Sequence, residues 1–150
     1  MKREQRIAHY REALEKAERD CAALVQGAEQ RLAAAEIQLT DLQRYREEYQ
    51  AGLGARVLHG ISGVALLDFH AFVARLGDAI RQQRDLVHRY RRERDQAAER
   101  LREAAVQNRT VGAVVERWRS EERLLESRQE QQANDERGQL AYVRQRISAA

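Results

Sequence analysis

The stretch AGLGARVLHGISGVALLD, Ala51–Asp68, decides the fold because it interrupts two long runs of helical pattern. Half of the eight glycines in the chain fall within it, at positions 52, 54, 60 and 63. Clustered glycines break regular structure and supply the backbone conformations that a turn needs. We therefore expect the chain to reverse here, with a turn at about residues 51–65.

On the N-terminal side of this stretch, apolar residues recur in steps of three and four, which is the spacing of a coiled-coil seam. The seam residues are Ile7, Tyr10, Leu14, Ala17, Cys21, Leu24, Ala28, Leu32, Ala35, Leu39, Leu42 and Tyr49, with Tyr45 alongside. Two successive steps of four between Leu24 and Leu32 form a stutter, which should unwind the supercoil locally. The pattern predicts a first helix over about residues 3–50.

The same spacing resumes after the glycine-containing stretch and does not slip. The seam residues there are Phe69, Val73, Leu76, Ile80, Gln83, Val87, Tyr90, Arg94, Ala97, Leu101, Ala104, Asn108, Val111, Val115, Trp118, Glu122 and Leu125. Beyond Leu125 the corresponding positions are Gln129, Gln132, Glu136 and Gln139, so packing should weaken there. The pattern predicts a second helix over about residues 66–147.

Two heptad helices joined by a short turn fold most economically as an antiparallel coiled-coil hairpin, so we expect an all-α fold and a single unit spanning residues 1–150. A reversal centred at about residues 58–59 would place Tyr45 opposite Phe72. Ile7 would then reach only to about Thr110. The C-terminal part of the second helix should overhang the first, leaving an apolar stripe without an internal partner. This stripe comprises Val111, Val115, Trp118, Leu124 and Leu125.

The composition supports an elongated helical protein. The chain has no Pro, 43% hydrophobic and 34% charged residues, and a mean hydropathy of -0.78. These values leave too few apolar residues for a compact core and argue against a β-rich domain. One cysteine excludes an internal disulfide, and no apolar run suits a signal peptide or a membrane span. We expect a cytoplasmic protein that a partner would bring to any membrane.

No enzyme is indicated by the sequence. The four histidines, at positions 9, 59, 70 and 88, never lie four residues apart, and no phosphate-binding loop or nucleophile elbow is present. We therefore expect no catalysis, no cofactor and no metal. Cys21 occupies a seam position and is interpreted as a small apolar core residue.

An arginine-rich stripe, RQQRDLVHRYRRER, Arg81–Arg94, raises a nucleic-acid hypothesis. Its six Arg face Asp85 and Glu93, within a chain whose net charge is only +3. Interleaved acids lower the field that phosphate binding requires, and Arg stems commonly cover a seam. A solvated or protein-facing stripe is therefore favoured, and a nucleic-acid-binding hairpin stays an alternative.

Hairpin pairing would gather much of the aromatic content near the turn. The gathered residues are Gln38, Leu42, Tyr45, Tyr49, Phe72, Leu76, Ala79 and Gln83. They can be seam residues alone, or seam residues that also present a partner-binding edge, because a two-stranded coiled coil leaves the sides of its core residues partly open. Trp118, outside the predicted paired length, is favoured as a partner contact.

Two strings before and after the turn, LTDLQRYREEYQAGL, Leu39–Leu53, and DFHAFVARLGDAIRQQR, Asp68–Arg84, are the most distinctive part of the chain. With the charged tail VVERWRSEERLLESRQEQQANDE, they resemble the FliJ family, the small coiled-coil component of the flagellar type III export apparatus. The resemblance covers nearly the whole chain in length, register and turn position.

The resemblance implies a non-enzymatic stalk, similar to the rotor shaft of rotary ATPases, that enters the hexameric export ATPase ring and meets the export gate membrane protein. It implies a gate contact at Gln38, Leu42, Tyr45, Tyr49, Phe72, Leu76, Ala79 and Gln83, where Gln83 departs from the His expected at that position. Export chaperones are the third implied partner, which we place with the ATPase contact at Val111, Val115, Trp118 and Leu125. Such a protein would serve motility from the cytoplasm, held at the inner membrane by the export apparatus. The stalk of a virulence type III secretion system is the other alternative.

Overall fold

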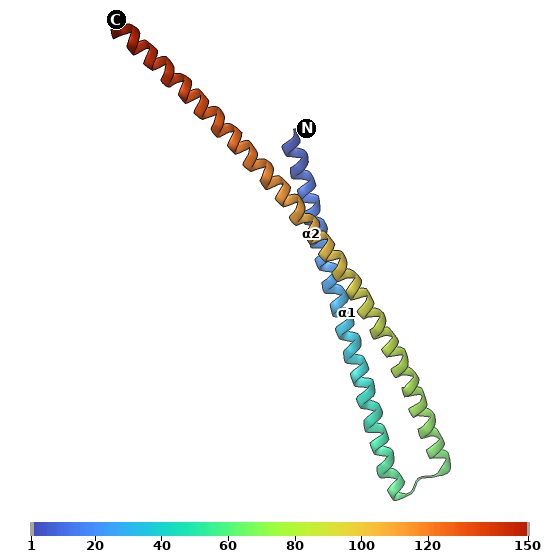
Figure 1. Ribbon diagram of the computed structural model, residues 1–150. Coiled ribbons are helices and arrows are strands. Elements are labelled where there is room, and N and C mark those ends of the chain that lie inside the picture. The colour runs from blue at the N-terminus through green and yellow to red at the C-terminus, as the bar shows by residue number, and fades with distance from the viewer. Residues whose placement is uncertain (1, 150) are drawn as a thin grey trace. The chain divides into compact units, whose positions relative to one another are not determined.

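The computed structural model describes residues 2–149, which form two long α-helices (Figure 1). Helix α1 spans Arg3–His59 and has 57 residues, and α2 spans Gly63–Ala149 and has 87. The helices pack against each other, and the part of the chain that the structure describes contains no strand. The prediction of an all-α fold built from two long helices is confirmed.

Contacts divide the chain into two compact units. The inner unit is Lys16–Ala105, and it contains the connection between the helices. The terminal unit combines residues 3–15 of α1 with residues 106–149 of α2. That residues 1–150 form a single unit stays a prediction.

The core of the inner unit is a narrow line of apolar side chains between α1 and α2. Its buried members are Ala28, Leu32, Ala35, Phe69, Leu76, Ile80 and Val87, and all of them occupy predicted seam positions. Leu32, Ala35 and Val87 form one cluster. Leu39 and Tyr90 pack against this cluster. The free energy of packing therefore comes from a single stripe on each helix, because only that stripe is removed from water.

The predicted stutter in α1 is wrong. Val25 is half-buried and Leu24 is exposed, so the seam follows a regular alternation of three and four residues from Val25 through Ala28 to Leu32. Further toward the N-terminus, Arg11 and Glu18 are half-buried in place of their apolar neighbours Tyr10 and Ala17. Long charged side chains can lie along a seam with their heads in water, so the apolar pattern alone misplaced the register.

The connection between the helices is shorter than the predicted turn at residues 51–65. Helix α1 continues through Gly52 and Gly54 to His59, and only residues 60–62 connect it to α2. Glycine in a helix costs about 1 kcal/mol, which the surrounding helix tolerates. Gly60 ends α1 with a φ of 89°, the left-handed conformation that glycine adopts without strain at a helix C-terminus.

Helix α2 begins at Gly63, earlier than the predicted start at about residue 66. The Ser62 hydroxyl accepts a hydrogen bond of 3.2 Å from the Ala65 amide. This is the N-cap arrangement, in which a side-chain oxygen satisfies an amide that the first helical turn leaves unpaired. The difference therefore has a local cause, an N-cap serine that the seam pattern does not include. At its other end α2 continues to Ala149, two residues past the predicted end.

The pairing of residues is close to the predicted one near the connection and differs in the terminal unit. Tyr45 and Phe72 lie with ring centroids 6.1 Å apart, as predicted. In the terminal unit, however, the Arg3 guanidinium lies 3.9 Å from the centre of the Trp118 ring. The prediction that Ile7 reaches only to about Thr110 is therefore wrong, because Ile7 shares a hollow with Val115 and Trp118. The connection is centred on Ile61 and not on residues 58–59, which moves the expected partner of Arg3 by about one helical turn toward the C-terminus of α2.

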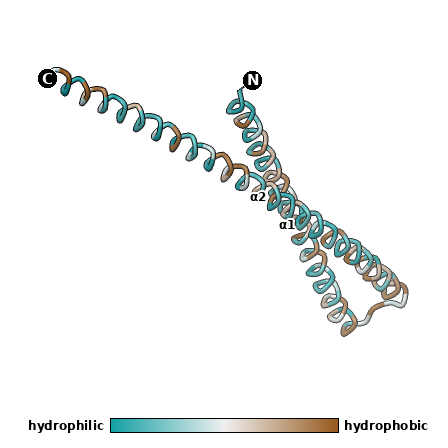
Figure 2. Tube along the Cα trace, turned by 45° about the horizontal axis from the view of Figure 1, so that its top comes forward, coloured by the Kyte–Doolittle hydropathy of each residue, from teal (hydrophilic) through white to brown (hydrophobic). Residues whose placement is uncertain are grey.

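The terminal unit contains one buried apolar residue of α2, Val115, with Val111 and Trp118 half-buried. The prediction that these three residues lack an internal partner is wrong for Val115 and Trp118. From Arg119 to Ala149 every described side chain is exposed, and we call residues 119–149 the C-terminal segment. Figure 2 shows this segment as mainly hydrophilic, with isolated hydrophobic positions.

Candidate partner-binding surfaces

Four aromatic rings from the two helices form a cluster in the inner unit, close to the connection. Tyr49 stacks on Phe69, with ring centroids 4.2 Å apart, and also contacts Phe72 at 4.5 Å. Tyr45 meets Phe72 edge to face, which is a favourable arrangement of two ring quadrupoles. Phe69 is buried, whereas Tyr45 is 48% exposed. The cluster therefore contributes to the core and also presents an aromatic edge at the surface.

An open hollow of about 520 Å³ adjoins the exposed edge of this cluster. It is lined by Gln38, Asp41, Leu42, Tyr45 and Gln83. The hollow combines an aromatic ring, an aliphatic side chain, two amides and a carboxylate. Such a mixture suits a protein surface that contributes both apolar contact and hydrogen bonds, as interface centres do.

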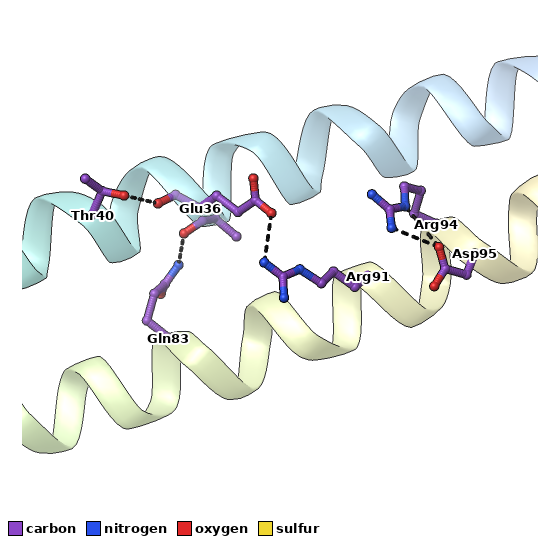
Figure 3. A network of polar contacts seen from close by, with 7 residues as sticks. Glu36, Thr40, Gln83, Arg91, Arg94 and Asp95 are labelled. Carbon is purple, nitrogen blue, oxygen red and sulfur yellow. Dashed lines mark hydrogen bonds and ion pairs between the residues drawn. The ribbon is translucent and has the colours of Figure 1, made fainter.

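Gln83 fixes one wall of the hollow. Its amide nitrogen donates to the Ala35 carbonyl oxygen at 3.0 Å and to the Gln38 side-chain oxygen at 3.2 Å. Figure 3 shows the Gln83 side chain of α2 directed at the backbone of α1. An α-helical carbonyl can accept this second bond because its oxygen has two lone pairs. Gln83 therefore holds the two helices in register beside the hollow.

The structure brings most of the predicted gate residues to one place, with different exposures. Gln38 and Tyr45 are exposed, and Leu76 is buried in the core. The half-buried members are Leu42, Tyr49, Phe72, Ala79 and Gln83. Sequence reasoning did not include Asp41 or Phe69. The position of Phe69 on the seam pointed to its packing, but no pattern pointed to Asp41.

The arginine-rich stripe, Arg81–Arg94, is largely neutralised by neighbouring carboxylates. The pairs are Arg81 with Asp78, Arg89 with Glu93, Arg91 with Glu36 and Arg94 with Asp95. The pair between Arg91 and Glu36 joins α2 to α1 (Figure 3). Because paired guanidinium groups are less available to phosphates, the stripe suits a solvated helix face rather than a nucleic-acid interface.

A second hollow, of about 250 Å³, lies in the terminal unit, and Arg3 and Trp118 are among the residues that line it. Its wall includes Ile7 of α1 and Val115 of α2. A guanidinium over an indole face is an attractive cation–π contact. Of the residues predicted to contact chaperones or the ATPase, Val115 and Trp118 thus line this hollow, while Leu125 lies in the exposed C-terminal segment.

Among residues 2–149, no group of three or more His, Cys, Asp or Glu side chains is placed to hold a metal ion. Neither helix, within the described residues, contains a stretch apolar enough to cross a lipid bilayer. Cys21 is a free, half-buried thiol beside a shallow hollow between α1 and α2 of the inner unit.

Paired seams, a narrow apolar core and surfaces that mix aromatic with polar side chains define a coiled-coil protein. The family model described as "Flagellar FliJ protein" matches residues 3–146, and the chain belongs to this family. Membership implies a role in flagellar type III protein export, a form of protein transport. No curated protein and no solved structure matches the chain.

Proposed function

We propose that this chain is a non-enzymatic stalk of the flagellar type III export apparatus, which links the export ATPase ring to the export gate and also binds export chaperones. The observation that carries the proposal is the family match over residues 3–146, which includes almost all of both helices. The matched family is flagellar, so we do not propose the stalk of a virulence system. The ion pairs along Arg81–Arg94 argue against nucleic acid as the partner.

The proposed stalk is an antiparallel hairpin with an overhanging C-terminal helix. Three contacts support this arrangement: Tyr49 with Phe69, Gln38 with Gln83, and Glu36 with Arg91. In each step away from the connection the α1 residue number falls and the α2 number rises. Exposure of the whole C-terminal segment supports the overhang.

The proposed gate contact is the surface around the aromatic cluster and its hollow. Its members are Gln38, Leu42, Tyr45, Tyr49, Phe72, Leu76, Ala79 and Gln83. Partner binding would use the exposed side of the surface, with Tyr45 as the central anchor, because buried aromatic anchors dominate interface energies. Leu76 would act by supporting the cluster from the core. Asp41, on the rim of the hollow, adds a carboxylate to this contact.

The proposed contact with the ATPase and the chaperones involves Val111, Val115, Trp118 and Leu125. Val115 and Trp118 line the hollow of the terminal unit. Leu125 adds an exposed aliphatic side chain. In this mechanism the chain contributes no chemistry. It couples the two machines mechanically from the cytoplasm, held at the inner membrane by the export apparatus.

A binding measurement with a matched pair of variants tests the gate contact. Tyr45→Ala and Tyr10→Ala remove the same ring from side chains that are 48% and 51% exposed. We expect Tyr45→Ala to weaken binding of the purified gate cytoplasmic domain by at least about tenfold in calorimetry, since interface tyrosines are common hot spots. Tyr10→Ala should bind like the wild-type chain. Equal affinity for the two variants, with helix content unchanged in both, would remove the aromatic surface from the gate contact.

A further inference from the structure

The connected ends of α1 and α2 carry large aliphatic side chains that no other part of the structure covers. These are Val57, Leu58, Val64 and Leu67, with exposures of 52%, 86%, 72% and 71%. We call these four residues the apolar cap. Exposed aliphatic side chains gathered within so short a segment are unusual for a protein surface and commonly mark a binding site. Figure 2 shows hydrophobic positions on both helices next to the connection.

The charge of this region differs from that of the rest of the chain. Charged residues make up 34% of the sequence, yet between Glu48 and Asp68 the only one is Arg56. His59 lies in the last turn of α1, beside it. The stretch of residues 49–67, which contains the apolar cap, therefore has one positive and no negative side chain, and this favours an anionic surface over a neutral or basic one.

The shape of the apolar cap also limits its partner. A helix that docks in a protein groove presents a stripe with steps of three, four and seven residues on one helix. The apolar cap instead takes two residues from the last turns of α1 and two from the first turns of α2. Side chains spread over the ends of two helices suit a deformable apolar medium that accepts them from several directions. The interfacial region of a lipid bilayer is such a medium.

We propose that the apolar cap binds directly to the interface of an anionic lipid bilayer. Its aliphatic side chains enter the acyl boundary, and Arg56 lies among the headgroups. The insertion is shallow, because residues 60–62 are not helical and unpaired backbone groups are costly in hydrocarbon. The sequence led us to expect that only a partner would bring the chain to a membrane, whereas the apolar cap supplies a contact of its own. This inference does not depend on the proposed export function.

Vesicle flotation with the full-length chain tests the inference. The vesicles consist either of phosphatidylcholine alone or of phosphatidylcholine mixed with phosphatidylglycerol. We expect the chain to float with the anionic vesicles and to be released by high salt, because salt screens the headgroup charge. The double variant Leu58→Ser, Leu67→Ser should lose at least about tenfold in partitioning, since two aliphatic side chains no longer leave water.

A matched control removes similar side chains elsewhere. Leu140→Ser with Ile147→Ser changes residues of the C-terminal segment that are 60% and 71% exposed. We expect this variant to float like the wild-type chain. All four changed residues are exposed, so we expect both variants to keep their helices, which circular dichroism checks. Equal flotation of the two double variants would overturn the inference.

A fluorescent reporter gives a second, independent measurement. In a Trp118→Phe background, Leu58→Trp places the single indole in the apolar cap, and Leu140→Trp places it in the C-terminal segment. Anionic vesicles should shift the emission of the first variant to the blue and leave the second unchanged. No shift at position 58 would overturn the inference. Two other results would also overturn the inference, if vesicles had no effect on the chain. Self-association that depends on Leu58 and Leu67 would show that the apolar cap binds a second copy. Gate binding without lipid that depends on these two residues would show that it binds a protein pocket.

Discussion

The inner unit and the C-terminal segment are both built from α-helix, yet only the helices of the inner unit bury a line of side chains against each other. In the inner unit a line of seam residues from both helices is buried, whereas the C-terminal segment has no buried side chain. Helix formation and core formation therefore have different causes in this chain. The segment is rich in Glu, Gln, Arg and Ala, which form helices by intrinsic propensity. The seam of the inner unit adds tertiary packing to that propensity.

The comparison has a consequence for stability along the chain. A helix that packs against nothing opens locally at low free energy, whereas a packed seam opens only when the unit unfolds. The C-terminal segment should therefore adapt its shape to a partner easily. The inner unit should keep the geometry of the aromatic cluster and its hollow. This division suits a stalk that holds one contact rigidly and adjusts another.

The largest expected effect comes from a cavity in the seam of the inner unit. Ile80 is 1% exposed, and Ile80→Ala should lower the free energy of unfolding by about 2–5 kcal/mol, because the lost contacts are not replaced. Leu125 is 56% exposed, and Leu125→Ala should change stability by no more than about 0.5 kcal/mol. Urea titration followed by circular dichroism measures both. If the two variants had similar midpoints, the seam would not be the source of stability.

Much of this fold could be predicted from the sequence, because a heptad pattern shows which side chains become buried between the helices. Every predicted seam position of α2 from Phe69 to Trp118 is buried or half-buried. In α1 the prediction failed where Arg11 and Glu18 occupy the seam. Long charged side chains can pack through their aliphatic stems, and an apolar pattern does not detect them.

The connection and the candidate site were predicted less well. Glycines marked the correct region, but only Gly60 has a backbone angle that requires glycine. Pairing of Tyr45 with Phe72 was predictable from the seam, whereas the bonds of Gln83 to Ala35 and Gln38 were not. Side-chain hydrogen bonds between helices depend on distances that a one-dimensional pattern does not contain.

Smaller effects on the free energy of unfolding are expected from alanine at two glycines of the inner unit, and the two effects should have opposite signs. Gly60→Ala should lower the free energy of unfolding by about 1 kcal/mol, because a φ of 89° is sterically unfavourable for alanine. Gly52→Ala should stabilise by about 0.4–1 kcal/mol, since Gly52 is helical and an added Cβ would meet no atom within 4 Å. Urea midpoints of the two variants measure the difference. The same sign for both variants would contradict either the helical conformation of Gly52 or the left-handed conformation of Gly60.

The smallest expected effect comes from the ion pair between the helices. Arg91 Nη2 and Glu36 Oε1 lie 3.4 Å apart, and both side chains are about half exposed, so water screens their attraction. A double-mutant cycle with Arg91→Gln and Glu36→Gln should give a coupling of about 0.2–1 kcal/mol. This coupling should fall further in about 1 M salt, where the screening length is only about 3 Å. A coupling of several kcal/mol that persists in salt would mean that charge, and not the apolar seam alone, separates the stability of the inner unit from that of the C-terminal segment.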